Sequence, residues 1–98
     1  MLIIPLVWYY LSMKLQPHHI QPGVFVAQPS HYPVRVWPEL GVDGRVMTSN
    51  GRFVEVNDIV VVVRPVSNDE GWFSAIHQGR QCYIHQLSFE SQQRFKLL

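Results

Sequence analysis

The chain has 98 residues, of which 47% are hydrophobic and only 15% are charged. This length holds one domain at most, and the single cysteine, Cys82, excludes an internal disulfide. The formal net charge is +1, and neither sign clusters, so charge does not favour nucleic-acid binding, which needs several cations on one face. The charged fraction lies well below about a quarter, the usual level. It predicts that a partner, or further copies of the chain, cover part of the surface.

Residues 1–13, MLIIPLVWYYLSM, are almost wholly apolar and carry no charge. No positive charge precedes Leu2, as a signal peptide would require. The apolar run stops at Lys14, short of the roughly 20 residues that a membrane-spanning helix needs. Pro5 interrupts a helix, so we expect an extended hydrophobic arm. Its partner-contacting side chains are predicted to be Ile3, Leu6, Trp8 and Tyr10.

The arm has two main alternatives, because exposed apolar segments are costly in water. It either pairs with its own barrel as an extra strand or docks on a neighbouring subunit. A third possibility is that Met13 is the true start of the protein. A membrane-surface anchor is disfavoured because Lys14 is the only nearby cation.

Residues 14–33 are predicted to form an irregular strap over the body of the domain. Each proline fixes its own φ and biases the preceding residue toward extended geometry. Residues 23–27, GVFVA, are the one place in this segment that could pair as a strand. Metal binding by the local histidines is not expected, because adjacent histidines point apart and no Cys or carboxylate completes a site. The prolines are Pro17, Pro22, Pro29 and Pro33, and the histidines are His18, His19 and His31.

Residues 34–89 form the predicted strand-rich body, and residues 90–98 form a short tail. A strand over 34–37 ends at Pro38. Asn50-Gly51 is a strong hairpin signal. It predicts that residues 44–49 pair with residues 52–56, with Met47 opposite Val54 on a buried face that continues to Val56.

The next segment, 59–63, is a run of five β-branched residues that predicts a strand buried on both faces. Residues 67–71 form a loop. Strands over 72–77 and 80–85 flank Gln78-Gly79, a second tight hairpin signal. Its register sets Ala75 against Cys82 and Ser74 against Tyr83.

This order of elements resembles the second half of an SH3-like β-barrel. The resemblance rests on Asn57-Asp58 before the buried strand, Gly71-Trp72 at the start of the next strand, and Cys82-Tyr83-Ile84-His85 at the end of the last. Cys82 stands where the family has glycine. The resemblance covers about residues 34–89. It implies an all-β fold: a small barrel of five or so antiparallel strands, followed by a single 3₁₀ turn.

The peptide-binding branch of that family holds proline-rich ligands in aromatic pockets. This chain has Trp72, but His85, Leu87 and Ser88 stand where that branch has Pro, Asn and Tyr. Capture of polyproline helices is therefore not expected. The ending looks more like bacterial SH3-like modules, which bind cell-wall peptides or serve as spacers. The predicted ligand- or partner-binding residues of the body are Trp37, Trp72, Tyr83, Asp69 and Glu70.

Few residues are candidates for catalysis, and no enzyme function is predicted. Cys82 could act as a nucleophile with His77 or His85 as base, but a buried structural cysteine is the better interpretation. Asp69 and Glu70 are adjacent loop residues and read as solvated turn residues. No phosphate-binding glycine loop occurs, and no cofactor or metal is predicted.

The preferred hypothesis is a non-enzymatic structural or assembly subunit that docks onto a larger protein complex through its arm and barrel surface. A virion or another multi-subunit particle is one setting. The partners would be other protein subunits, either identical or different. The first alternative is a bacterial-type SH3-like module that binds a peptide or cell-wall component, and the second is a small nucleic-acid-binding barrel. The sequence indicates no signal peptide, so the protein would be cytoplasmic or part of a particle.

Overall fold

The computed structural model describes residues 20–30, 33–90 and 94–98. The predicted arm, 1–13, lies outside the described residues together with its four proposed contact side chains, Ile3, Leu6, Trp8 and Tyr10. The first part of the predicted strap, 14–19, lies outside them as well.

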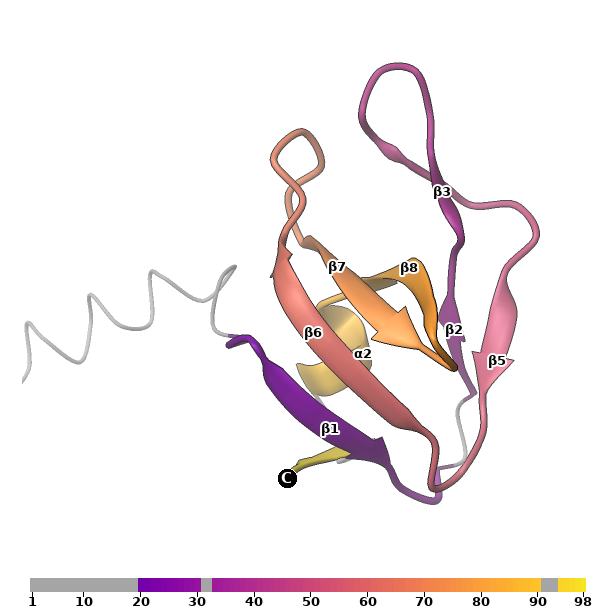
Figure 1. Cartoon of the computed structure of the whole chain (residues 1–98), viewed down its shortest axis with the longest axis vertical. Coiled ribbons are helices and arrows are strands. Elements are labelled where there is room, and N and C mark those ends of the chain that lie inside the picture. The colour runs from indigo at the N-terminus through magenta and orange to yellow at the C-terminus, as the bar shows by residue number, and fades with distance from the viewer. Residues whose placement is uncertain (1–19, 31–32, 91–93) are drawn as a thin grey trace, which may run out of the picture.

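The described chain is all-β with a single helical turn, which confirms the predicted fold class (Figure 1). Antiparallel strands form a five-stranded sheet in the order β8-β7-β6-β1-β9 and two small two-stranded sheets, β2-β5 and β3-β4. The result is a small, barrel-like fold. The elements are β1 (Gly23–Ala27), β2 (Val34–Val36), β3 (Glu39–Leu40), β4 (Val46–Met47), β5 (Arg52–Val54), β6 (Ile59–Pro65), β7 (Trp72–His77), β8 (Arg80–His85), α2 (Leu87–Glu90) and β9 (Phe95–Leu97).

The hairpin of β7 and β8 has the predicted register. Ala75 lies opposite Cys82 and Ser74 opposite Tyr83. Gln78 and Gly79 both have positive φ, 56° and 72°, which is the geometry of the type I′ turn that matches the twist of paired strands. The sequence pattern and the turn chemistry agree here, and the predicted hairpin is confirmed.

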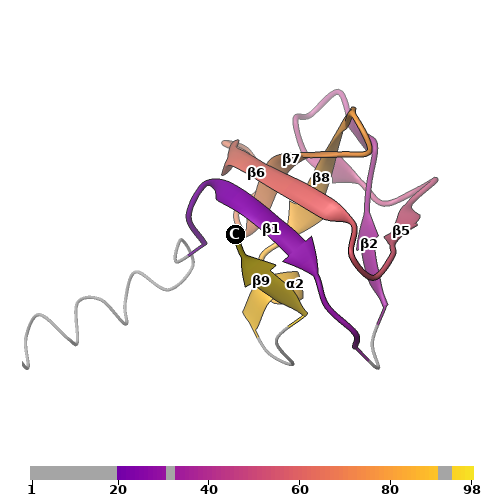
Figure 2. The same ribbon diagram turned by 60° about the horizontal axis from the view of Figure 1, so that its bottom comes forward.

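The five-stranded sheet extends beyond the predicted body at both ends. β1 comes from the predicted strap and lies between β6 and β9 (Figure 2). β9 comes from the predicted tail and pairs Phe95 with Ala27 and Leu97 with Phe25. Within the predicted strap, residues 23–27 are the one place expected to be able to pair as a strand, and that expectation is confirmed.

The hairpin predicted at Asn50-Gly51 is wrong. β4 pairs with β3, whereas β5 pairs with β2, so the strands on either side of this turn separate. Asn50 keeps the expected left-handed conformation, with φ of 58°. The ring of Trp37 covers Gly51 so closely that a Cβ there would lie 2.5 Å from Cζ3. Pairing with β2 and packing against Trp37 thus outcompete the local hairpin.

The buried face predicted for that hairpin is also wrong. Met47 is 43% exposed and Val56 is 50% exposed. With β4 and β5 in different sheets, Met47 and Val54 no longer face each other, and Val56 lies in a turn beyond the end of β5. Only Val54 contributes to the core, as a partly buried residue at its edge.

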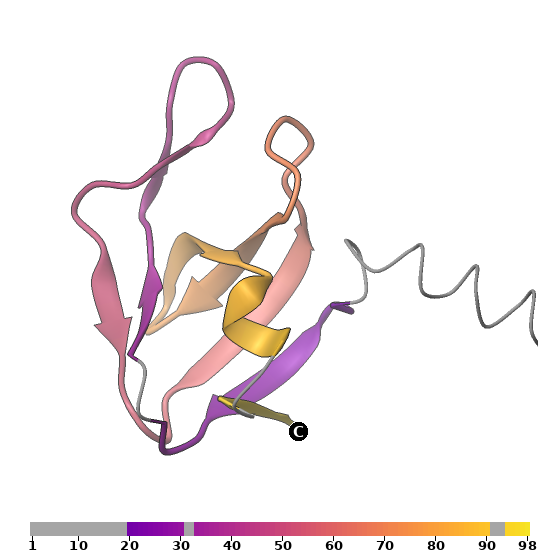
Figure 3. The ribbon, with the colours of Figure 1, turned by 180° about the vertical axis from the view of Figure 1, so that it is seen from behind.

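The core lies on the concave side of the sheet. β6, β7 and β8 supply its centre, β2 covers it from the opposite side, and α2 brings Phe89 against it (Figure 3). The strand β6 alternates, with Val60 and Val62 buried and Ile59 43% exposed. The prediction that this strand is buried on both faces is therefore wrong. The buried core residues are Ile20, Val34, Val36, Val60, Val62, Phe73, Ala75, Cys82 and Ile84.

Candidate interaction surface

The outer face of the five-stranded sheet carries an apolar strip across three neighbouring strands. Register places Val24 of β1 opposite Val61 of β6, and Val61 opposite Ile76 of β7. Val26 and Ile59 form a second pair beside them. Directly opposed residues share one face of a sheet. We call these five residues, Val24, Val26, Ile59, Val61 and Ile76, the outer strip.

The outer strip remains in contact with water. Val24 is 39% exposed, Ile59 43% and Ile76 42%, while Val26 and Val61 are half-buried. Their β-branched side chains suit a strand, but strand propensity alone does not require both faces to be apolar. An antiparallel sheet with one solvated face normally alternates apolar and polar residues, so this strip departs from the usual pattern.

Polar side chains border the outer strip on both sides. Gln81 of β8 lies opposite Ile76, and Lys96 of β9 lies opposite Val26. Both are exposed. An exposed apolar area with a polar rim is typical of protein–protein contact sites. The arrangement could bury apolar area against a partner while the charged and amide groups stay in water.

The structure brings three of the predicted aromatic site residues into one region. Trp37 and Tyr83 exchange two backbone hydrogen bonds: the Trp37 N–H donates to the Tyr83 carbonyl at 2.9 Å, and the Tyr83 N–H donates to the Trp37 carbonyl at 2.7 Å. Trp72 lies opposite His85, with ring centroids 4.9 Å apart in an edge contact. Tyr83 is opposite Ser74, two residues after Trp72, so the two aromatic residues are diagonal neighbours on one face of the hairpin, where Tyr83 is buried.

The two acidic site residues have different environments. Oδ2 of Asp69 accepts a hydrogen bond from the Val46 N–H at 3.0 Å, which ties the loop at 66–71 to β4. Glu70, beside it, is exposed. Asp69 therefore has a structural role that sequence reasoning did not identify.

A cleft of about 310 Å³ lies beside the same loop. It is lined by residues of the β3–β4 hairpin, the loop at 66–71 and strands β6, β7 and β8. The lining offers both hydrogen-bonding and apolar groups, the combination common in small-ligand sites. Side chains that line it include Leu40, Arg64, Asn68, Gln81 and Tyr83.

A buried polar network lies at the opposite end of β7, and the sequence analysis missed it. His77 is completely buried. Its Nε2 lies 2.8 Å from Oδ2 of Asp58, and its Nδ1 accepts a hydrogen bond from Arg52 Nε at 3.2 Å. Arg52 Nη2 also donates to the His77 carbonyl at 2.9 Å. Strict alternation of side chains along the strand from Phe73 predicts that His77 points inward. A buried imidazole needs polar partners. The alternation was therefore a sequence signal for this network.

The hydrogen bonds of Asp58 shift its titration. Oδ2 accepts from His77 and from the Glu55 N–H at 2.9 Å. These two bonds, that with His77 being the larger cause, lower the pKa of Asp58 below its ordinary value of 3.8. Asp58 thus remains a carboxylate throughout the neutral range and is a fixed acceptor for the buried imidazole.

Cys82 lies in the core opposite Ala75, as the predicted register requires. Burial raises the pKa of its thiol to about 11. A thiol that stays protonated at neutral pH is a poor nucleophile. Among residues 20–30, 33–90 and 94–98, no group of three or more His, Cys, Asp or Glu side chains is placed to hold a metal ion. No helix in those same ranges is long and apolar enough to span a membrane.

The chain was also compared with known proteins. No protein family, no curated protein and no solved structure matches it significantly.

Proposed function

We propose that this protein is a non-enzymatic structural subunit that joins a larger protein assembly through the outer strip of its barrel. The observation that carries the proposal is the exposed apolar strip with its polar rim. A monomer in water gains nothing from that arrangement, whereas a subunit buries it on association. The scarcity of charge, 15% of the residues, fits the same role.

The kind of barrel we propose is SH3-like. The meander β6–β7–β8, the helical turn α2 after β8 and the return of β9 to β1 support this likeness. Barrels of that type commonly serve as adhesive modules. The likeness concerns topology and does not identify a partner.

The first partner we propose is a second copy of the chain. Two apolar strips can face each other around a two-fold axis, because such an interface uses the same patch on both subunits. A net charge of only +1 gives little electrostatic repulsion between copies. The polar rim of Gln81 and Lys96 would then border the contact.

Sedimentation velocity of the intact protein from micromolar to millimolar concentration tests this function. We expect reversible self-association that Ile76→Glu weakens at least about tenfold, because a carboxylate would be buried in the apolar contact. Val42→Glu is the matched control, because Val42 is fully exposed at the tip of the β3–β4 hairpin. A chain that stays monomeric throughout, or equal loss in both variants, would contradict the proposal.

The cleft beside Tyr83 favours a second candidate, a module that binds a peptide or cell-wall fragment. Trp72 is half-buried and does not itself line this cleft, but it lies two residues before Ser74, which does. Trp72→Ala should abolish binding of a cell-wall peptide, measured by calorimetry, while the circular dichroism of the variant stays that of the parent. Unchanged binding by Trp72→Ala, or no binding by the parent protein, would eliminate this candidate.

A further inference from the structure

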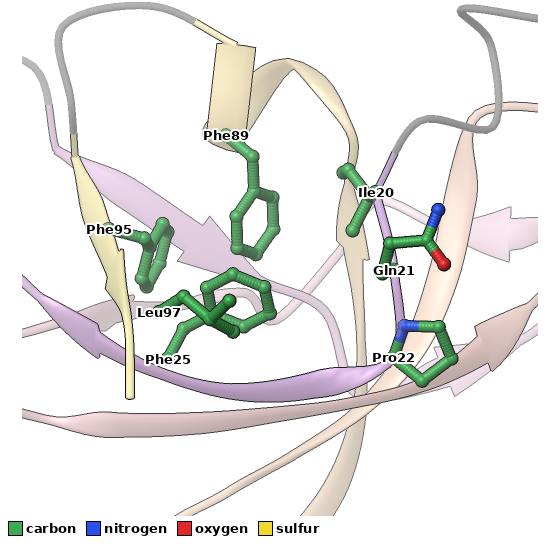
Figure 4. A pocket seen from close by; sticks show the side chains of 7 residues that line it. All are labelled: Ile20, Gln21, Pro22, Phe25, Phe89, Phe95 and Leu97. Carbon is green, nitrogen blue, oxygen red and sulfur yellow. The ribbon is translucent and has the colours of Figure 1, made fainter.

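An apolar groove of about 280 Å³ opens at the end of the sheet where β1 and β9 meet α2. Figure 4 shows the rings of Phe25, Phe89 and Phe95 gathered with Leu97 on one side of it, and Ile20, Gln21 and Pro22 on the other. The rings of Phe89 and Phe95 stack with centroids 4.5 Å apart, and Phe25 meets Phe89 edge-on at 4.9 Å. We call this the phenylalanine groove.

Most of the apolar side chains of the phenylalanine groove are not fully buried. Its three rings pack against the core only as partly buried residues, and Leu97 is 63% exposed. Among the residues that the structure describes, no charged side chain lines it, and Gln21 is its only polar one. An aromatic cluster in this state leaves apolar area in water that one or two further apolar side chains would cover.

We propose that residues 1–13 of the same chain fill the phenylalanine groove. These residues carry no charge and include Leu6, Trp8 and Tyr10, so their chemistry matches the lining. The described chain begins at Ile20, which itself forms a wall of the groove. Residues 14–19 span at most about 20 Å when extended, so they hold the segment within reach of the site.

The short connection favours the same chain over a second copy. A binding segment joined through a short link acts at an effective concentration in the millimolar range. Another molecule's segment would have to compete at the free protein concentration, which is usually far lower. Occupation of the groove within one chain also leaves the outer strip, on the opposite face of the sheet, open for the proposed assembly contact. The inference does not depend on that proposed function.

The test uses NMR on the intact protein. We expect nuclear Overhauser contacts between ring protons of Phe89 or Phe95 and methyl groups of residues 2–6, together with slowed amide exchange in residues 2–13. A sample that mixes ¹³C-labelled and unlabelled chains separates contacts within a chain from contacts between chains. Contacts found only between chains would overturn the inference in favour of a second copy. An intact chain without any such contact would overturn it outright.

Two neighbouring leucines supply a matched pair of variants. Leu97 lines the groove, whereas Leu98 is similarly exposed, at 67%, and does not line it. Leu97→Glu should cut the amide protection of residues 2–13 at least about tenfold, because a carboxylate in the groove opposes apolar contact. Leu98→Glu should leave that protection unchanged. Equal effects of both variants would contradict the inference.

Removing residues 1–12, which leaves Met13 as the first residue, gives a third measurement that does not depend on strand β9. We expect amide shift changes confined to the residues that line the groove, and stronger fluorescence of an apolar dye that binds the emptied site. No change at Phe25, Phe89 or Phe95 would contradict the inference. Self-association through the outer strip would persist in this variant, so failure of one proposal is distinguishable from failure of the other.

Discussion

The fully buried imidazole of His77 shares a hydrogen bond of 2.8 Å with the carboxylate of Asp58. Because Nδ1 of His77 accepts from Arg52, the ring's own proton sits on Nε2 and is donated to Asp58. The ring lies between the guanidinium of Arg52 and the carboxylate of Asp58. The network joins β5, which belongs to the small β2-β5 sheet, to the end of β7 in the five-stranded sheet through Asp58 in the turn before β6.

Replacing Asp58 by alanine should therefore lower the free energy of unfolding by about 2–3 kcal/mol, because the Nε2–H of His77 would be left buried without an acceptor. Asp43→Ala is the control: Asp43 also accepts a backbone hydrogen bond, from Arg45 at 3.0 Å, but in an exposed turn. We expect that variant to lose less than about 1 kcal/mol. Urea unfolding followed by fluorescence measures both, and equal losses would disprove the role given to the network.

The lowered pKa of Asp58 predicts a dependence of stability on pH. Its folded-state pKa lies below 3.8, so the unfolded chain binds the proton more readily. The contribution of this pair is complete above the unfolded value and is lost as the pH falls through the folded pKa. Unfolding curves recorded between pH 6 and about pH 2.5 should show a shallower acid loss for Asp58→Asn than for the parent. Parallel curves would count against this assignment.

The thiol of Cys82 should be unreactive in the folded protein. It is buried in the core, and burial raises its pKa to about 11. At pH 8 we expect labelling by a disulfide reagent to proceed only through unfolding, and to become complete in denaturant. Rapid labelling of the native chain would show that β8 opens locally, or that this thiol is not where the register places it.

The turn between β7 and β8 should accept a stabilising change. Gln78 occupies a left-handed conformation, φ of 56°, that Asn tolerates better than Gln. Gln78→Asn should therefore increase the free energy of unfolding by roughly 0.5–1 kcal/mol and raise the midpoint of thermal unfolding accordingly. Gln78→Ala should bring no gain, since alanine has no such preference. A destabilised Gln78→Asn protein would mean that the Gln78 side chain itself contributes to the native state.

The fold could be predicted from sequence where the turn residues and the long-range strand pairing favour the same structure. Gln78-Gly79 joins two strands that remain partners, so its register followed from the sequence. Asn50-Gly51 gives the same kind of signal, but β5 finds a longer-range partner in β2 and Trp37 packs on Gly51. Tertiary pairing decided that case, and turn chemistry alone could not reveal it.

The surfaces were less predictable than the strands. The outer strip depends on which strands lie beside one another, and β1 could not be placed next to β6 from sequence without knowing the sheet order. Trp72 and Tyr83 come from the adjacent strands β7 and β8, and Trp37, just after β2, pairs with Tyr83 through an isolated bridge. Their packing partners, such as His85 against Trp72, emerge only in three dimensions. His77 lies at an inward position of β7, but its two partners, Arg52 and Asp58, come from other segments that the sequence does not place beside it.

The place of β1 between β6 and β9 has a consequence for how the molecule is made. β1 leaves the ribosome first among the described strands, yet its two neighbours are separated from it by more than thirty and about seventy residues of chain. During synthesis both edges of β1 stay unpaired at first, and its pairing with β9 forms only when Phe95–Leu97 emerge. We expect slow folding dominated by distant contacts. A nascent chain stalled before β9 should be the species most prone to aggregate.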